Sequence, residues 1–127
     1  MKKLYLLDTS VLSGFLSKEK KYLKEMEKYE DGNWAISAIT EFELFLYKEK
    51  YSLSSKFFLN FLDSFIVLPL ERDVFDTAAG LFKKRNHPKP HLADLLIVAT
   101  SIVNKTPLIT GDKGMQKYKH AEVVVLD

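Results

Sequence analysis

The sequence predicts an α/β protein in which a mostly parallel sheet of four to five strands carries helices on both faces. Short β-rich runs alternate with segments of helical periodicity along the whole chain, which is the order typical of such folds. The first run, KLYLL, is apolar at successive positions, as in a strand that is buried on both faces. No repeat, linker or low-complexity tract interrupts residues 1–127, so we expect a single domain.

Each expected element has its own local signal. Lys3–Leu7 and Trp34–Ser37 are short apolar strands, and Phe65–Leu68 is a third strand that stops at Pro69. Glu71–Arg85 has acids at its start and basic residues at its end, which matches the helix dipole. The other expected helices are Ser10–Ser17, Lys18–Tyr29, Glu41–Lys50, Leu53–Phe65, the apolar His91–Val103 and the short Lys113–Lys119, and the last two strands are Pro107–Thr110 and Glu122–Leu126.

The composition fits one globular domain. Of the 127 residues, 46% are hydrophobic and 28% are charged, which allows a packed core. The absence of cysteine excludes disulfides, thiolate catalysis and cysteine-bound zinc. The N-terminal apolar run meets Asp8 too early for a signal peptide, and no stretch approaches the roughly 20 apolar residues of a membrane span. We therefore expect a cytoplasmic protein without a membrane association.

Four acids fall where this topology would bring them together. Asp8 directly follows the first strand, Glu43 lies one helical turn after the second, and Asp112 comes shortly after the fourth. Asp94 lies in the first turn of the apolar helix HLADLLIVATSI. Ligand sites of parallel sheets lie beyond the carboxyl ends of the strands, where the strand order switches. We therefore expect the four side chains to face one site.

Each acid also has a local explanation. Asp8 could cap the next helix, Glu43 could complete a capping box with Thr40, and Asp112 could be a turn or cap residue. Asp94 is the hardest to explain locally, because an ionised carboxylate on an apolar helix is costly without a cation or hydrogen bonds. The local explanations are independent of one another, whereas a single acidic site accounts for all four positions.

The chemistry of such a cluster is specific. Carboxylates held close together stay ionised only around positive charge. With no cysteine and only three histidines, the ligands would be hard oxygens, which suit Mg²⁺ or Mn²⁺. Two such ions can activate a water and stabilise the leaving oxygen in phosphodiester cleavage. Because the net charge is +2, gathering four acids in one pocket leaves a positive surround that suits a polyanionic substrate.

At these positions the sequence resembles the PIN-domain family. The motifs LYLLDTSVL, ISAITEFEL, ADLLIVATSI and LITGDKG occur in the family's order over nearly the whole chain. The likeness is strongest to the single-domain VapC toxins of prokaryotic toxin–antitoxin pairs. It implies an Mg²⁺- or Mn²⁺-dependent endoribonuclease that holds one or two ions and leaves a 5′-phosphate and a 3′-hydroxyl. It also implies a homodimer, an RNA substrate such as tRNA or mRNA, and a small antitoxin that blocks the acidic pocket.

Carried over to this sequence, the resemblance assigns roles to individual residues. The catalytic and metal-binding acids are Asp8, Glu43, Asp94 and Asp112, with Ser10 and Thr110 as supporting polar neighbours.

Two positions in these motifs have an alternative. Glu43 is chosen over Glu41 because it precedes a leucine, as in the family, and the two glutamates lie about 200° apart around a helix. The fourth motif departs from many VapC sequences, which carry a later aspartate where Met115 stands. Asp112 would take that role, as in other PIN proteins.

The basic residues Lys84, Arg85, Lys89 and Lys113 are candidates to hold the RNA backbone. The first three belong to KKRNHPKPH, just ahead of Asp94, although lysines at helix ends also occur as solvated partners of the dipole. The phenylalanines of residues 57–65 are interpreted as core, or as a dimer or antitoxin surface.

Other functions remain open at this level. A haloacid-dehalogenase-like phosphatase would carry a second aspartate where Ser10 stands, and a receiver domain would carry an adjacent acidic pair that is missing here. A PIN nuclease in RNA processing and a non-catalytic PIN-like module that binds RNA or protein are the two remaining alternatives.

Overall fold

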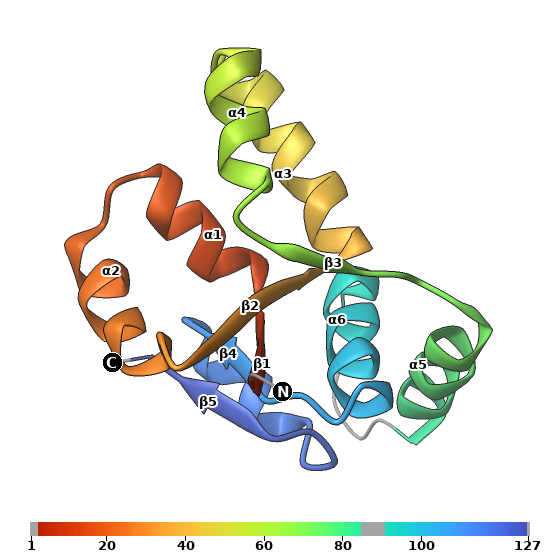
Figure 1. The fold of residues 1–127 in the computed structure, drawn as a ribbon. Coiled ribbons are helices and arrows are strands. Elements are labelled where there is room, and N and C mark those ends of the chain that lie inside the picture. Colours follow the sequence, from red (N-terminus) through yellow and green to blue (C-terminus); the bar gives the residue numbers. More distant parts are fainter. Residues whose placement is uncertain (1–2, 85–90, 127) are drawn as a thin grey trace.

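The computed structural model describes residues 3–84 and 91–126 and contains one five-stranded parallel sheet (Figure 1). The strands lie in the order β3-β2-β1-β4-β5, and each neighbouring pair is parallel. The predicted α/β class and the predicted parallel sheet are therefore confirmed. The strands are β1 (Lys3–Leu7), β2 (Gly32–Ser37), β3 (Ile66–Leu68), β4 (Leu108–Thr110) and β5 (Val123–Val125).

The helices follow the expected pattern to within a few residues. They are α1 (Thr9–Leu16), α2 (Lys20–Met26), α3 (Ala38–Lys50), α4 (Ser55–Leu62), α5 (Arg72–Lys84) and α6 (Leu92–Val103), with the 3₁₀ turns η1 (Glu27–Tyr29) and η2 (Lys113–Lys117). Within the described residues, no helix has the length and apolar character needed to cross a membrane.

The start of α3 differs from the prediction. We expected a helix from Glu41, whereas α3 begins at Ala38, because the Ser37 hydroxyl caps it and accepts a hydrogen bond from the Ile39 amide at 3.3 Å. Thr40 therefore lies inside the helix, and the capping box of Thr40 with Glu43 is wrong.

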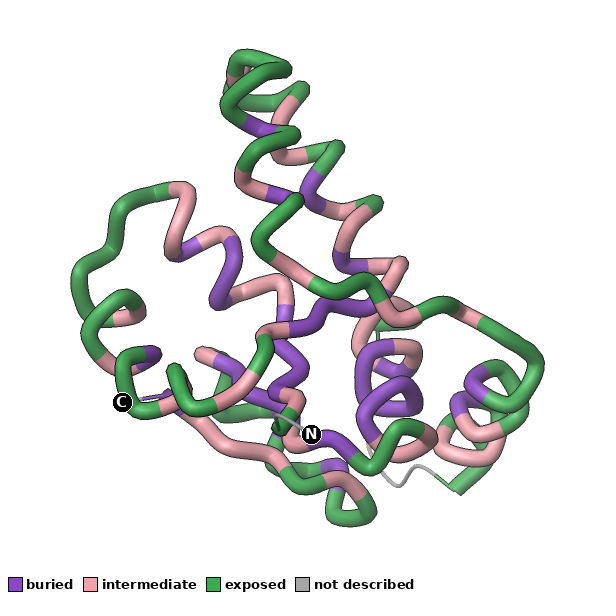
Figure 2. Tube along the Cα trace, in the orientation of Figure 1, coloured by how far each residue is buried: buried purple, intermediate pink, exposed green. Residues whose placement is uncertain are grey.

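Both faces of the sheet are buried at β1, which explains the apolar run of this strand. Successive side chains of a strand point to opposite faces. Tyr5 and Leu7 belong to the core that includes residues of α1 and α4, and Leu6 belongs to the core that includes residues of α5 and α6. Figure 2 shows that buried positions run along β1 and β2 of the sheet and along α6 beside it.

The strand order reverses at β1. The chain builds β2 and β3 on one side of β1 and then returns to build β4 and β5 on the other side. Leu7 of β1 is paired with Ile109 of β4, and the Asp8 amide donates to the Ile109 carbonyl at 2.8 Å. The carboxyl ends of β1 and β4 thus lie side by side at the topological switch point, which is where α/β proteins bind ligands.

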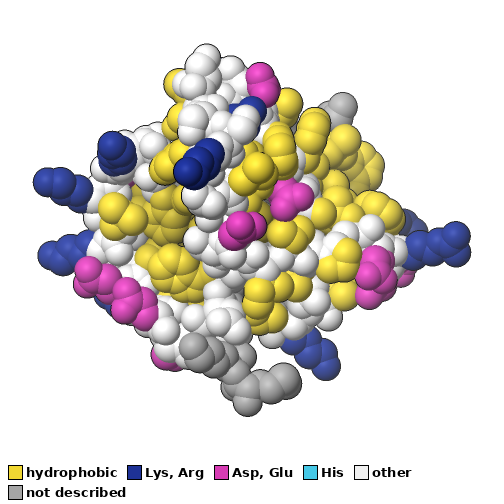
Figure 3. All heavy atoms as spheres, turned by 45° about the horizontal axis from the view of Figure 1, so that its top comes forward, with side chains coloured by type: hydrophobic (Ala, Val, Ile, Leu, Met, Phe, Trp, Pro, Cys, Tyr) yellow, Lys and Arg dark blue, Asp and Glu magenta, His cyan; other side chains and the backbone are white. Residues whose placement is uncertain are grey.

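Helices α3 and α4 form a hairpin that projects away from the sheet (Figure 1). Phe58 of α4 is fully buried, and its ring packs edge-to-face on Phe45 of α3 with 4.9 Å between ring centroids. Other apolar side chains of the hairpin remain exposed, namely Phe42, Phe45, Leu46, Phe57 and Leu59. In Figure 3 the top of Figure 1 is turned towards the viewer. Hydrophobic side chains cover much of this face, with acidic side chains between them.

We expect Phe58 to hold this hairpin together. Phe58→Ala should lower the free energy of unfolding by about 3–5 kcal/mol, because it leaves a cavity at a fully buried site. Phe57→Ala on the same helix is the matched control and should cost about 1 kcal/mol or less, since Phe57 is already 52% exposed. Urea denaturation measures both values, and equal losses would contradict the assignment of Phe58 as the anchor.

Candidate active site

Asp8 is a buried carboxylate at the end of β1, with 5% of its surface exposed. Its Oδ2 accepts hydrogen bonds from the Thr110 hydroxyl at 2.6 Å and from the Ser10 hydroxyl at 2.9 Å. Its Oδ1 accepts from the Thr9 amide at 2.9 Å, and Asp8 is the N-cap residue of α1. The capping role considered from the sequence is therefore present, and the same carboxylate lies at the end of β1, where the strand order switches.

The two hydroxyl groups connect Asp8 to the chain that follows β4. While it donates to Asp8, the Ser10 hydroxyl accepts from the Gly111 amide at 3.1 Å. The Thr110 hydroxyl likewise accepts from the Asp112 amide at 3.0 Å. Each hydroxyl thus uses its hydrogen on the carboxylate and an oxygen lone pair on the backbone. The arrangement ties the start of α1 to the turn at residues 111–112.

Glu43 reaches the site from α3 through a residue that sequence reasoning missed. The Thr9 hydroxyl lies 2.7 Å from Glu43 Oε1, to which it donates, and 3.0 Å from the Thr40 hydroxyl oxygen. The contact links the residue after Asp8 to the second acid and involves Glu43 rather than Glu41. The only signal in the sequence was the adjacency of Thr9 to Asp8, which is not specific.

Asp94 is half-buried in the first turn of α6, and its pKa is raised above the ordinary value. Burial is the largest cause, and the negative charge of Asp8 comes next; the charges of Asp112 and Glu43 add to the effect, whereas His91 opposes it. A helix N-terminus favours a carboxylate by about 0.3–1 kcal/mol. The raised pKa shows that burial and like charge outweigh that benefit. The negative charges of the other three predicted acids therefore all act on Asp94.

Asp112 lies at the exposed edge of the site. It is the N-cap residue of η2, and its Oδ1 accepts from the Gly114 amide at 2.8 Å. Its negative charge also contributes to the raised pKa of Asp94. As with Asp8, the local role and the proximity to the other acids coexist.

Tyr118 is a second residue that sequence reasoning missed. It is buried with 5% of its surface exposed, and its pKa is raised, first by burial and then by the negative charge of Asp94. The negative charge of Asp94 therefore acts on the Tyr118 phenol as well. Its position in the sequence does not distinguish it from an ordinary core tyrosine.

The donor chemistry of these residues fits a hard divalent cation, because all four groups are carboxylates whose mutual repulsion a cation would relieve. The spacing is a separate matter. Across residues 3–84 and 91–126, no three histidine or acidic side chains form a ready-made metal site. Any three of Asp8, Glu43, Asp94 and Asp112 would have to move closer together than they lie here in order to share one ion.

The structure describes two of the four candidate RNA-binding residues, Lys84 and Lys113. Lys113 is exposed next to Asp112. Lys84 ends α5 and lines a hollow with Ile102 and His120, and Ile102 is about 12 Å along α6 from Asp94 at 1.5 Å per residue. Arg85 and Lys89 lie outside the described residues. Lys113 is therefore the one of these four that the structure places beside an acid of the site.

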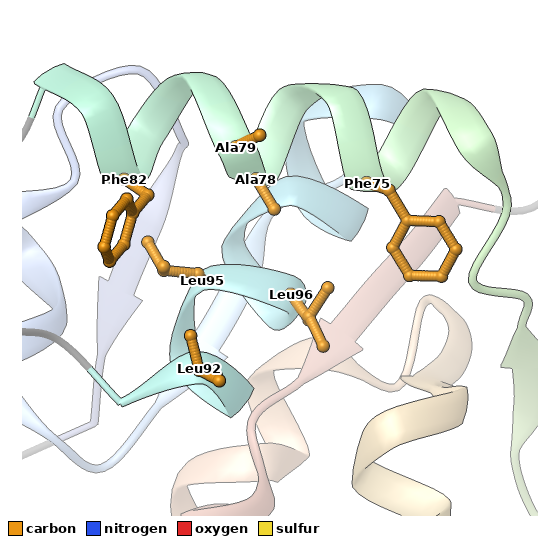
Figure 4. A pocket seen from close by; sticks show the side chains of 7 residues that line it. All are labelled: Phe75, Ala78, Ala79, Phe82, Leu92, Leu95 and Leu96. Atoms are coloured by element: carbon orange, nitrogen blue, oxygen red, sulfur yellow. The ribbon is translucent and has the colours of Figure 1, made fainter.

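A larger hollow of ≈ 460 Å³ lies between α5 and α6 (Figure 4). It offers no group for phosphodiester chemistry, since its lining is entirely apolar: Phe75, Ala78, Ala79, Phe82, Leu92, Leu95 and Leu96. The acids at the switch point, not this hollow, form the candidate active site.

Comparisons with known proteins agree with this fold. The family model of the PIN domain matches residues 5–121. A toxin–antitoxin complex from Klebsiella pneumoniae has a TM-score of 0.81 and 24% identity, covering 97% of this chain and 98% of that chain. VapBC2 from Rickettsia felis, bound to a DNA fragment from its promoter, has a TM-score of 0.78 and 18% identity, covering 98% and 99%. FitAcB from Neisseria gonorrhoeae has a TM-score of 0.76 and 26% identity, covering 98% and 96%.

The parallel sheet with acids at its switch point thus defines an α/β protein of the PIN type, and the matched region spans most of the chain. The chain belongs to the PIN domain family, and its fold is VapC-like. A comparison with curated proteins gives no match.

We expect the Thr110 hydroxyl to stabilise the fold. Thr110→Val should lower the free energy of unfolding by about 1–3 kcal/mol, because it removes a bond to buried Asp8 and the acceptor of the Asp112 amide. Thr110→Ser keeps the hydroxyl and should cost less. Urea denaturation compares the two variants, and a valine variant as stable as the serine variant would show that the hydroxyl contributes nothing.

Asp94 should destabilise the metal-free protein at neutral pH. When a carboxyl has a higher pKa in the folded than in the unfolded state, the folded protein loses stability as the pH rises. The loss begins at the unfolded pKa, near 3.8, and continues through the folded pKa. In EDTA, Asp94→Asn should therefore raise the melting temperature near neutral pH, and the gain should vanish in acid below that unfolded value. Thermal melts across this range test the sign; a lower melting temperature of the variant at neutral pH would contradict it.

Proposed function

We propose that this PIN domain protein is an Mg²⁺- or Mn²⁺-dependent endoribonuclease that acts as the toxin of a VapBC-type toxin–antitoxin pair. The observation that carries the proposal is the placement of the four acids around the switch point. Hydrogen bonds through Thr9, Ser10 and Thr110 connect the end of β1 with Glu43 and with the backbone of Asp112, and the charges of Asp8, Glu43 and Asp112 all raise the pKa of Asp94. The substrate would be RNA, such as tRNA or mRNA, and the protein would work in the cytoplasm. The likeness of its fold to toxin–antitoxin complexes supports the toxin role.

One or two Mg²⁺ or Mn²⁺ ions would supply the positive charge and Lewis acidity that phosphodiester hydrolysis requires. The protein's own residues would prepare the site in different ways. Asp8 is held by three hydrogen bonds, so it provides a fixed oxygen ligand. Thr9 orients Glu43 by the 2.7 Å bond to its carboxylate. Asp94 adds a half-buried carboxylate whose negative charge is relieved when a cation arrives.

The substrate would approach from the side of the turn after β4. Asp112 and Lys113 are exposed there, and the ammonium group of Lys113 can neutralise a phosphate of the RNA backbone. The exposed apolar side chains of α3 and α4 give a surface that a partner would cover. This supports a homodimer and a small antitoxin protein as partners of the chain.

One observation favours a second candidate, a non-catalytic PIN-like module that binds RNA or protein. The acids do not form a ready-made metal site within the described residues. The two functions differ in their response to Mn²⁺, because an ion that binds only the folded protein raises its melting temperature. A PIN nuclease in RNA processing would respond to Mn²⁺ in the same way as a toxin, but it would have no antitoxin that inhibits it.

The decisive experiment is cleavage of a pool of structured RNAs, tRNAs included. With Mn²⁺ we expect discrete cuts that EDTA abolishes and that Asp8→Asn and Asp94→Asn both lack, since each variant removes a negative ligand. Melting temperatures measured with and without Mn²⁺ should rise for the wild type and change less for these variants.

The two glutamates of α3 provide a matched pair of control variants. Glu43→Gln should lose most of the cleavage rate, whereas Glu41→Gln, two residues away on another side of the helix, should keep it. Full activity in Asp8→Asn or Asp94→Asn would refute the assignment of the site. A well-folded wild type that shows no cleavage and no Mn²⁺ stabilisation would favour the non-catalytic module.

A further inference from the structure

Tyr22 of α2 lies between two glycines that are far apart in the sequence. One edge of its ring faces Gly14 in α1, and the other edge faces Gly111, the residue before Asp112. A Cβ atom built at Gly14 would lie 2.5 Å from Cε2 of the ring and 3.0 Å from Cγ. A Cβ atom built at Gly111 would lie 2.9 Å from both Cε1 and Cζ, and closer still to the hydroxyl oxygen.

These two glycines serve close approach rather than an unusual backbone conformation. None of the glycines in the described residues has a positive φ. Gly14 lies inside α1, where glycine costs about 1 kcal/mol relative to alanine. The space beside the Tyr22 ring explains why a small residue is needed there, and the same reasoning holds for Gly111. The ring and the two glycines therefore fit together as one unit.

The turn that Tyr22 contacts is the one that carries the fourth acid. The Gly111 amide is bonded to the Ser10 hydroxyl at 3.1 Å, and Ser10 is itself bonded to Asp8. The Tyr22 ring lies against the same glycine and fills the space that a side chain at position 111 would need. The ring is held in turn by the core that includes Val11 and Leu12, and the Lys21 ammonium lies 5.1 Å from its centroid.

We propose that Tyr22 is a positioning residue of the active site: its ring seats the turn at residues 111–112 against Ser10 and so sets the direction of the Asp112 carboxylate. The proposal rests on the proposed metal-dependent activity. Tyr22 touches neither the substrate nor the ion; it acts through Gly111 on Asp112. Substituting a residue that orients a metal ligand without binding the ion itself typically lowers metal affinity or activity by about 10- to 100-fold.

The test is the affinity of the full-length protein for Mn²⁺, measured by isothermal titration calorimetry. Tyr22→Leu removes the ring and should weaken Mn²⁺ binding about tenfold. Tyr22→Phe keeps the ring and should bind Mn²⁺ like the wild type. In an Asp112→Asn background, Tyr22→Leu should cause little further loss, because the group that Tyr22 orients is already changed.

The matched control is Tyr29→Leu. Tyr29 is a partly buried tyrosine packed against the same core, with its ring 5.1 Å from that of Tyr5 and no part in the turn. It should lower the melting temperature as Tyr22→Leu does but leave Mn²⁺ affinity unchanged. Equal affinities for wild type and Tyr22→Leu, or equal losses in both leucine variants, would overturn the proposal.

Gly111→Ala approaches the same contact from the other side and decides the question if Tyr22→Leu does not fold. It should weaken Mn²⁺ binding by forcing the turn away from the ring, and unchanged binding would count against the proposal. A wild type that neither binds Mn²⁺ nor cleaves RNA would overturn the proposed function and this inference with it. A wild type that does both, with Tyr22→Leu unaffected, would overturn this inference alone.

Discussion

The hydrogen-bonded carboxylate of Asp8 is the interaction on which the arrangement of the site depends. It is buried at the end of β1, and a buried ionised group is tolerated only when its oxygens are bonded. The Thr9 amide and the hydroxyls of Ser10 and Thr110 meet this need. The two hydroxyls then pass the constraint to the backbone at residues 111 and 112. One buried charge thus fixes the junction of β1, α1 and β4, the three elements that meet where the strand order switches.

The negative charges of the other acids destabilise this same junction. Asp94 is half-buried at the start of α6, and its neighbours raise its pKa, so the folded state holds negative charge that it would not gather for stability alone. The two cores on either side of the sheet hold the elements in place against this repulsion. A fold that accepts such a conflict at one edge is typical of a site built to take up positive charge. Asp8 is rigidly held, whereas Asp112 stands at the exposed rim, so the acids differ in how freely they can adjust to an ion.

Most of the fold could be predicted from the sequence, because the signals were strong where burial is uniform. KLYLL is apolar at every position after Lys3, and it forms a strand covered on both faces. The start of α3 could not be predicted, because Ala38 and Ile39 continue the apolar run of β2 and only the Ser37 cap separates strand from helix. The positions of Asp8, Glu43 and Asp112 followed from the ends of strands, and that of Asp94 from the start of the apolar helix. The parts played by Thr9, Tyr22 and Tyr118 did not, because each depends on which side chain it meets from a distant segment, and periodicity does not encode that.

For Asp8 and Asp112, the sequence offered two alternatives, a helix cap or a site residue. In the structure these two alternatives do not exclude each other. In a parallel α/β sheet, the helix that follows a strand begins at the carboxyl edge, which is also where ligands bind. An aspartate that caps such a helix is therefore already at the site. Capping uses one oxygen, Oδ1 in both residues, while a carboxylate has about four acceptor positions. In Asp8 the Oδ2 atom accepts two further bonds, from Ser10 and Thr110, so about one acceptor position is left. The cap bond fixes the direction of the side chain at the edge where ligands bind, so a capping role there does not count against a functional role.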